Sequence, residues 1–342
     1  MLNIKCFKAA KGDCFLLTWI SEGQRRLLID SGIAGTYRFF APLVRDFSTN
    51  DHVIMTHVDY DHIGGLFKWL NDRKEKFSNE VSLYMNTPQL LITPPSGDQV
   101  GIEHGINLEE ELYNQGIEPK SMYVTPDGDN TLDLGGLILK VISPPEEVLK
   151  QLLERWTADQ IYQEYIKRRA EQDNKVSIPG SKELKSKEEI LNSPPKPHKW
   201  EDDLLNASSI AFILKYKESN LLFLGDANPD LIADELANLT WSTTKKLPLK
   251  LFKISHHGSK KNTTQRLLEM IDCSDYLIST DSTGPYYHPS RETLILISEY
   301  GRSDNTVPIT IYSNYTLAID KLLSLEEREN IMFKEIHEIN IV

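Results

Sequence analysis

Four side chains that can bind metal ions lie within six consecutive positions of this chain, which has only nine histidines. They are His57, Asp59, Asp61 and His62. Imidazole and carboxylate groups at such density are the ligands with which proteins hold pairs of divalent ions. Such pairs generate hydroxide at neutral pH and stabilise a transferring phosphoryl or acyl group. The alternative is a solvated turn whose residues only cap a helix, because Asp is favoured at that position.

The metal-binding run lies between two stretches of different periodicity. Residues 51–55 form an apolar stretch of strand length, and residues 66–70 have apolar spacing that suits a helix. The sequence therefore predicts a strand-to-helix loop. Alternation along an extended segment would place the first three ligands on one side, and His62 would turn back at the helix start. Gly64 and Gly65 would permit close backbone packing beneath.

The run resembles the H-x-H-x-D-H motif of the metallo-β-lactamase superfamily, with Asp59 where the second histidine usually stands. This substitution is typical of one branch, the soluble metallo-β-lactamase domain of ComEC-type competence DNA-uptake proteins. The resemblance implies an α/β (α+β) fold, an αββα four-layer sandwich with metals at the edge where two sheets meet. It also implies a hydrolase with two divalent metal ions.

Further segments resemble the same branch in the expected order and cover most of the chain. They are Lys11-Gly12-Asp13-Cys14, 27–32, 206–210 with 221–226, 253–259 and Tyr287-His288-Pro289-Ser290. Lys11, with Ala10 before it, departs from the usual Gly-x-Gly-Asp turn. Asp226 lies 30 residues before His256 and 62 before His288, which leaves room for a helix and strands between site loops.

The resemblance assigns roles to residues in these segments. Asp226 would bridge both ions, and His288 would be the last metal-binding histidine. The implied metal-ligand set is His57, Asp59, Asp61, His62, Asp226 and His288. Asp13, Asp30 and Asn206 would contact the ligands and not the metal ions themselves. Considered alone, Asp30 could be a helix N-cap, and His288 could be a turn residue before Pro289.

The predicted catalytic residues are Asp61, His256 and His257. Adjacent residues at a strand end point to opposite sides, so one of the two histidines is expected to face the site. Because the resemblance implies that this pair lies near the scissile bond, the inward histidine would contact phosphate or transfer a proton to the leaving oxygen, which suits imidazole near neutral pH. Asp61 would orient the attacking water. Ser259 and Lys260, or its neighbour Lys261, would bind an anionic substrate, although each could be ordinary surface.

The third motif of the superfamily supplies a histidine with no clear counterpart here. His104 and His198 are candidates by position only, and His198 lies in a proline-rich loop. Asp203 or Asn206 would then take this place and make one metal site richer in oxygen. Carboxylate-rich sites suit manganese or magnesium, and histidine-rich sites suit zinc. Manganese is favoured, with zinc as the main alternative and magnesium as a further one.

The spread of site segments predicts one domain over residues 1–342. Residues 144–203 depart from its strand-rich pattern, because they are charged and helix-prone. They are predicted to form a helical and loop insertion, either packed on one face or serving as a lid or protein-binding arm. Residues 97–116 would form a smaller insertion with a helix. Strand-like runs for the sheets are 28–30, 53–55, 81–85, 210–216, 221–224, 251–254 and 309–312.

Composition restricts location and partners. A formal net charge of −12 disfavours non-specific DNA binding over the whole surface. Basic residues follow the site loops at Arg38, Lys68, Arg73, Lys74 and Lys76. They would form either a local basic rim beside the site or an ordinary solvated helix surface. Three cysteines without a C-x-x-C pair predict no disulfide framework. No apolar run reaches the length of a membrane span, so a cytoplasmic protein without membrane contact is expected.

The leading prediction is a phosphodiesterase or nuclease that uses a two-metal-activated hydroxide on DNA or RNA. The residues themselves indicate only metal-assisted hydrolysis, and the nucleic-acid substrate comes from the resemblance. A small phosphodiester such as a cyclic nucleotide is an alternative that the acidic charge favours. From a different class, the chain could be a subunit of a multi-protein assembly whose partner regulates the metal site.

Overall fold

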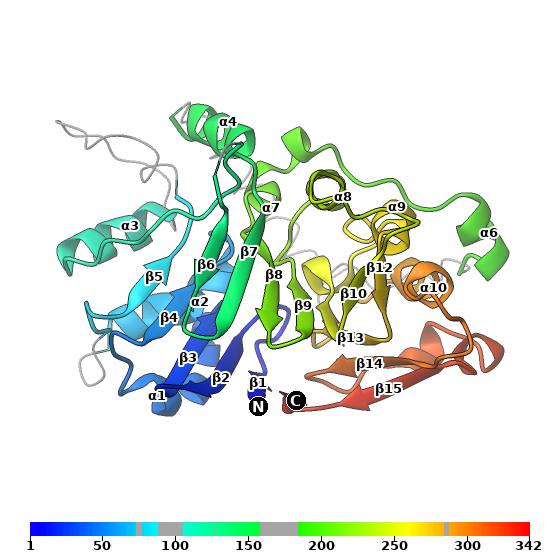
Figure 1. Cartoon of the computed structure of the whole chain (residues 1–342), viewed down its shortest axis with the longest axis horizontal. Helices are drawn as coiled ribbons and strands as arrows, with labels where there is room; N and C mark the ends of the chain where they lie inside the picture. The colour runs from blue at the N-terminus through cyan, green and yellow to red at the C-terminus, as the bar shows by residue number, and fades with distance from the viewer. Residues whose placement is uncertain (73–76, 88–104, 127, 158–183, 284–286) are drawn as a thin grey trace.

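The computed structural model describes residues 1–72, 77–87, 105–126, 128–157, 184–283 and 287–342. Two β-sheets lie one against the other, and helices cover their outer faces (Figure 1). This is the αββα four-layer sandwich that the sequence predicts. Among the described residues, no helix is both long and apolar enough to cross a membrane.

The first sheet has the strand order β16-β1-β2-β3-β4-β5. Its strands are β1 (Leu2–Cys6), β2 (Phe15–Ser21), β3 (Gly23–Ile29), β4 (Asp51–Ile54), β5 (Ser82–Tyr84) and β16 (Glu338–Ile341). The pairs from β16 to β3 are antiparallel, whereas β3, β4 and β5 run parallel. Ile29 pairs with Ile54, so the loops after β3 and β4 leave the sheet side by side.

The second sheet has the order β15-β14-β13-β11-β9-β8-β7-β6. Its strands are β6 (Thr131–Asp133), β7 (Leu137–Ser143), β8 (Ala211–Tyr216), β9 (Ser219–Phe223), β11 (Leu251–Lys253), β13 (Asp275–Ile278), β14 (Ile309–Ser313) and β15 (Ile331–Glu335). From β9 to β15 all pairs are parallel. A separate parallel pair consists of β10 (Leu247–Leu249) and β12 (Ile271–Cys273).

Three hydrophobic clusters correspond to the three interfaces between layers. Phe15 and Phe223 belong to the cluster between the sheets. Phe40 and Trp69 belong to a second cluster, where α1 (Tyr37–Val44) and α2 (Tyr60–Leu70) cover the first sheet. The third cluster joins the second sheet to α8 (Pro229–Asn238), α9 (Gln265–Glu269) and α10 (Arg291–Tyr300). Period-two alternation decides the layers: Val53 belongs to the outer cluster and Ile54 to the inner one.

The described parts of the predicted insertion pack against the sandwich. Val148 and Leu152 of α4 (Glu146–Thr157) join the cluster under α2, and Ile190 of α6 (Lys187–Asn192) joins that of the second sheet. Residues 158–183 and 88–104, on which parts of the insertion predictions fall, lie outside the described residues. The lid or partner-binding role therefore stays a prediction. The other helices of the described residues are α3 (Gly105–Asn114), α7 (Leu204–Ala207) and the 3-10 turns η1 (Ala34–Thr36), η3 (Trp200–Asp202), η4 (Ser255–Gly258), η5 (Ile319–Lys321) and η6 (Glu326–Arg328).

Every strand-like run predicted from sequence overlaps a strand of the structure. The local geometry predicted for Asp61 is wrong. Helix α2 begins at Tyr60 with Asp59 as its N-cap residue, so Asp61 lies in its first turn and not on an extended segment, whereas His62 lies at the helix start as predicted. The solvated-turn alternative is also wrong, because His57 is 1% exposed and His62 is fully buried.

His52 on β4 gives a pH-dependent contribution to stability. Burial lowers the pKa of His52 to about 4, against the effect of Asp51 and with the help of Arg25 and Lys120. Between this value and the ordinary value of 6.5, the unfolded chain binds more protons than the folded one, so stability is lost as pH falls. We expect the free energy of unfolding to fall less for His52→Gln than for wild type between about pH 6.5 and about pH 4.

Urea denaturation at several pH values measures this difference. The control is His198→Gln, which replaces an exposed histidine and should keep the wild-type pH dependence. Identical pH dependence for His52→Gln and wild type would contradict the prediction.

Candidate metal centre

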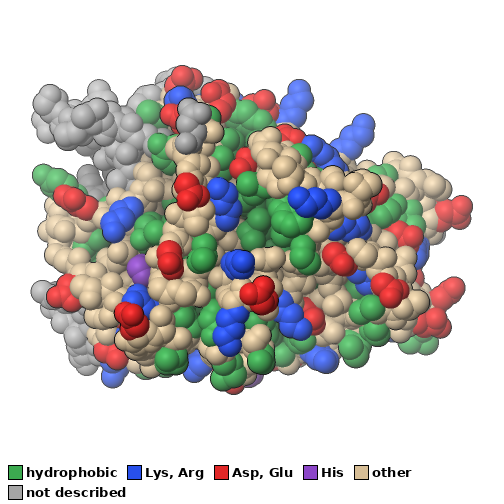
Figure 2. All heavy atoms as spheres, in the orientation of Figure 1, with side chains coloured by type: hydrophobic (Ala, Val, Ile, Leu, Met, Phe, Trp, Pro, Cys, Tyr) green, Lys and Arg blue, Asp and Glu red, His purple; other side chains and the backbone are tan. Residues whose placement is uncertain are grey.

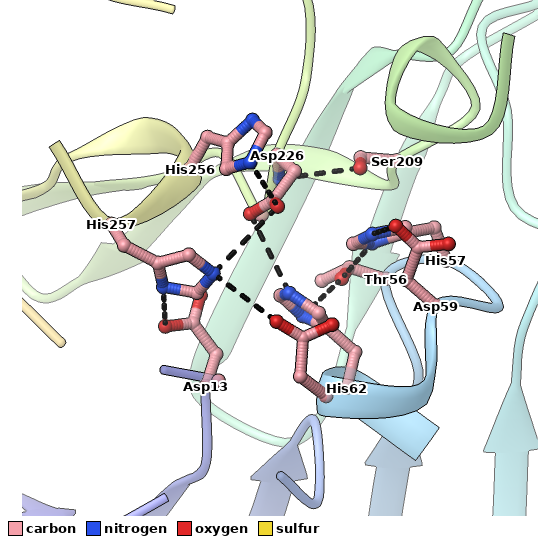
Figure 3. A network of polar contacts seen from close by, with 12 residues as sticks. Asp13, Thr56, His57, Asp59, His62, Ser209, Asp226, His256 and His257 are labelled. Carbon is pink, nitrogen blue, oxygen red and sulfur yellow. Dashed lines mark hydrogen bonds and ion pairs between the residues drawn. The ribbon is translucent and has the colours of Figure 1, made fainter. Parts of the chain in front are cut away.

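The predicted ligands come from loops at the carboxyl ends of parallel strands in both sheets. The loops after β3 and β4 carry Asp30 and the run 57–62, and the loops after β9 and β11 carry Asp226 and the pair 256–257. Ligand sites in sheets of this kind are formed at such edges, because the loops after parallel strands converge there. Figure 3 shows side chains of both sheets pointing at one another across this edge.

Asp226 is the point at which the two sets of side chains meet. Its Oδ1 lies 3.5 Å from His62 Nε2, and its Oδ2 lies 3.6 Å from His256 Nε2 and 3.8 Å from His257 Nε2. Burial opposes ionisation of Asp226, but the charges of His256, His62 and His257 outweigh it and hold its pKa well below the usual range. Two oxygens facing different imidazoles are the arrangement required of a bridging carboxylate.

Asp30 and Thr56 fix the proton positions on two histidines. The Thr56 hydroxyl donates to Asp30 Oδ2 over 2.8 Å, so Thr56 Oγ1 accepts from His57 Nδ1 at 3.1 Å. His62 Nδ1 also donates to Asp30 Oδ2, at 2.8 Å. The Nε2 atoms of His57 and His62 are buried and make no hydrogen bond. In their neutral forms, both imidazoles therefore present an Nε2 lone pair to the site.

Asp30 reaches this position because its φ of 54° turns the chain sharply after β3. Its second oxygen, Oδ1, accepts the Thr56 backbone N–H at 2.7 Å. The N-cap alternative for Asp30 is wrong, since the next helical turn, η1, has Ile33 as its N-cap residue. Asp30 instead accepts hydrogen bonds from Thr56 and His62, two residues of the candidate centre.

His256 and His257 both face Asp226, contrary to the expectation that neighbours point to opposite sides. That expectation assumed extended backbone, whereas the structure has φ of 47° at His256 and 55° at His257. His257 is buried, and its Nδ1 donates to the Ser279 carbonyl at 2.9 Å because a carbonyl can only accept. Its Nε2 then faces Asp61 Oδ2 at 3.8 Å. The His256 side chain is 23% exposed.

Three groups of side chains have donor atoms within 4.8 Å of one another in the described part of the chain. His62 belongs to all three, which are His57-His62-Asp226, Asp61-His62-His257 and Asp13-Asp30-His62. Asp59 Oδ2 lies 3.6 Å from His57 Nε2, beside the first group. Buried atoms without a hydrogen bond, which include His257 Nε2 and Asp226 Oδ1, cost about 1–3 kcal/mol each. A bound cation would offset this cost, so the residues fit a centre for divalent metal.

His288 and Asn206 lie less directly at this centre. The His288 ring centroid is 5.7 Å from that of His256, and burial, with the charges of His256 and His257, lowers the pKa of His288 to about 3. His288 is in none of the three groups, and its role as a ligand stays a prediction. Asn206 Nδ2 donates to Asp203 Oδ2 at 2.7 Å. As third-motif candidates, His198 is exposed, and His104 lies outside the described residues.

The predicted substrate contacts have partners within the protein. Ser259 is buried, and its hydroxyl accepts the Lys261 backbone N–H at 3.3 Å. Lys260 Nζ donates to Glu292 at 2.9 Å. In the suggested basic rim, the Arg38 guanidinium lies 4.6 Å from the centroid of the Phe39 ring. Residues 73–76 of this rim are outside the described ranges. Roles for these residues in substrate binding stay predictions.

Sequence reasoning missed four residues of this site: Thr56, Ser209, Lys253 and Ser279. The Ser209 hydroxyl accepts the Asp226 backbone N–H at 3.2 Å. Thr56 and Ser279 are small polar residues just after buried strands, a common pattern that is weak by itself. The lysine at the end of the apolar run 251–253 was the clearest available signal, because lysine is rarely fully buried.

Comparison with known proteins agrees with this architecture. Residues 10–141 match a family model described as "Metallo-beta-lactamase superfamily". No curated protein matches the chain. Similar solved structures include the metallo-beta-lactamase fold protein YhfI from Bacillus subtilis, with 10% identity, a TM-score of 0.44 and coverage of 99% of this chain and 100% of that one. A proposed metal-dependent hydrolase from Parabacteroides distasonis has 10% identity, a TM-score of 0.35 and 97% coverage of both chains.

Both TM-scores are below 0.5, so these two structures carry no argument. The family model covers less than half of the chain. The match over residues 10–141 includes the metal-binding run 57–62. With the four-layer architecture, it confirms the predicted fold.

Proposed function

We propose that this chain, a protein of the metallo-β-lactamase fold, hydrolyses phosphodiesters, with nucleic acid as the favoured substrate. The observation that carries the proposal is the pair of overlapping ligand groups, His57-His62-Asp226 and Asp61-His62-His257. His57 with Asp226 and Asp61 with His257 would hold two cations close together, with the single free nitrogen of His62 serving one of them. A pair of cations suits the two oxygens of an in-line phosphoryl displacement. Asp59 beside the first group adds a carboxylate where the wider superfamily has a histidine.

Divalent ions held by these groups would activate water and stabilise negative charge on a transferring phosphoryl group. Two partly exposed side chains are placed to act on the substrate. The Asp61 side chain is 18% exposed and can orient the attacking water through its carboxylate. The His256 imidazole is 23% exposed and can donate a hydrogen bond or proton to the departing oxygen. Buried His257 is assigned to metal binding in place of proton transfer.

Different observations favour a nucleic-acid polymer and a small phosphodiester as the substrate. The resemblance to ComEC-type domains supports nucleic acid. A net charge of −12 repels polyanions at long range, and on the face shown in Figure 2 basic and acidic side chains are interspersed. A small phosphodiester such as a cyclic nucleotide is therefore the second candidate. Two bound divalent ions would reduce the repulsion near the site itself.

The test is turnover of labelled single-stranded DNA, double-stranded DNA and RNA, of a cyclic dinucleotide, and of bis(p-nitrophenyl) phosphate. Each substrate is assayed with manganese, magnesium and zinc. Cleavage of a polymer would support the nuclease, and turnover of small esters alone would support the second candidate. A protein that binds two ions and cleaves none of these diesters would contradict the proposal.

His256→Gln tests the assignment of the exposed imidazole. We expect about a 100-fold loss of the rate constant for cleavage, a typical contribution of a general acid, with metal content unchanged. The loss should be smaller for bis(p-nitrophenyl) phosphate, because p-nitrophenolate leaves without protonation. His198→Gln, which changes an exposed histidine of the 193–199 loop, is the matched control and should keep the wild-type rate. Equal losses on both kinds of ester would argue against proton transfer by His256.

A further inference from the structure

Lys253 is a buried lysine whose side chain lies beneath the candidate metal centre. It is the last residue of β11 and is 1% exposed. Transfer of an ammonium group from water to a protein interior costs several kcal/mol unless the charge is paired. Lys253 Nζ donates to Asp13 Oδ2 and, at 3.4 Å, to the carbonyl oxygen of Gly225. The Lys253–Asp13 pair is fully buried on both sides.

Both acceptors belong to loops of the site. Asp13 lies in the turn between β1 and β2, in the first sheet, and Gly225 immediately precedes Asp226 in the second sheet. Lys253 itself lies three positions before His256. A single ammonium group therefore connects three segments that carry the centre, across the interface between the sheets.

Asp13 continues the connection to one histidine. Its Oδ1 lies 3.5 Å from His257 Nδ1, the nitrogen that donates to the Ser279 carbonyl. The Ser279 hydroxyl donates to the Gly12 carbonyl at 2.7 Å and so closes a ring of contacts around the imidazole. The Asp13 carboxylate depends on Lys253 for both its position and its counter-charge.

We propose that Lys253 is a positioning residue of the metal centre. By holding the Asp13 carboxylate against His257, it keeps Nε2 of that imidazole directed at the group formed with Asp61 and His62. The proposal rests on the proposed function, because it requires that the centre binds metal. The alternative is that the Lys253–Asp13 ion pair only stabilises the fold. Buried ion pairs of this kind contribute little net stability. The two interpretations predict different metal affinities for variants that lack the Lys253–Asp13 pair.

The test measures dissociation constants for both metal equivalents by competition with a chelator, in wild type, Lys253→Met and Asp13→Asn. Loss of outer contacts to a ligand typically weakens metal binding by about 10–100-fold. We expect a loss of this size for the ion bound with His257, and little change for the ion bound with His57. Cobalt absorption spectra of the loaded variants should also change, since they report ligand geometry.

Arg26→Met is the matched control. Arg26, in the middle of β3, forms a buried pair with Asp51, the first residue of β4, at the opposite end of that strand from the centre. The Arg26→Met substitution should lower the free energy of unfolding and leave both metal dissociation constants unchanged. Unaltered constants in folded Lys253→Met or Asp13→Asn would overturn the proposal. Wild type that binds no metal would instead overturn the proposed function, so the two failures are distinguishable.

A measurement on wild type covers the case in which neither variant folds. Nitrogen-15 spectra of histidine rings, with His257 identified by its loss in His257→Gln, report which nitrogen carries the proton. The proposal requires the proton on Nδ1 in the metal-loaded protein. A proton on Nε2 of His257 would overturn it.

Discussion

Asp226→Asn is expected to abolish both metal binding and hydrolysis. Asparagine has one neutral oxygen where the site requires two anionic ones, and the imidazoles of His62, His256 and His257 would lose their common partner. Loss of the transition-state stabilisation that a metal pair supplies is worth several kcal/mol, so the rate should fall by about 1,000-fold or more. Metal content by mass spectrometry and initial rates on the best diester substrate measure the two effects.

Asp234→Asn is the control for this experiment. Asp234 lies on α8, with a side chain that is 61% exposed and paired with Arg266 at 2.6 Å. It should keep two ions and the wild-type rate, since exposed pairs contribute little. If Asp226→Asn folds with both ions bound and full activity, the centre is not where the structure places it.

Gly65→Ala is expected to destabilise the protein although it lies within helix α2. Alanine normally favours a helix over glycine by about 1 kcal/mol. Here an added Cβ would lie 2.2 Å from the Ser31 carbonyl oxygen and 3.0 Å from the Phe40 ring. A backbone oxygen cannot move aside without shifting the turn that carries Asp30. Overpacking of this kind costs about 1–3 kcal/mol, which outweighs the helix preference.

The free energy of unfolding measured with urea tests this expectation, and metal affinity should fall with it because the Asp30 turn must shift. Gly35→Ala is the matched control, since its nearest neighbour would lie 4.0 Å from an added Cβ. Greater stability of Gly65→Ala than of wild type would show that helix preference dominates. An added Cβ at Gly64 would lie 2.7 Å from the Ala34 backbone nitrogen, so the close packing predicted for Gly64 and Gly65 is confirmed.

The adjacent histidines show where sequence reasoning reached its limit. The run Ser255-His256-His257-Gly258 follows a strand and predicts a site loop correctly. Which side each imidazole faces depends on the backbone torsions, and positive φ at two non-glycine residues is uncommon enough that no pattern predicts it. His257, one of two candidates for proton transfer, is buried and belongs to a candidate ligand group, so the role proposed for it is metal binding. The start of α2, predicted at His62, lies at Tyr60.

What the sequence determined by itself is the chemistry available and the layers that hold it. Dense His and Asp residues after an apolar strand indicate a metal site, and alternating apolar positions decide which strand faces enter the core, because both signals depend on neighbouring residues. Tertiary structure alone decided the proton positions on the histidines and the support beneath them. Lys253 and Asp13 are 240 positions apart, and their contact depends on how two sheets pack, which no local pattern in the sequence encodes.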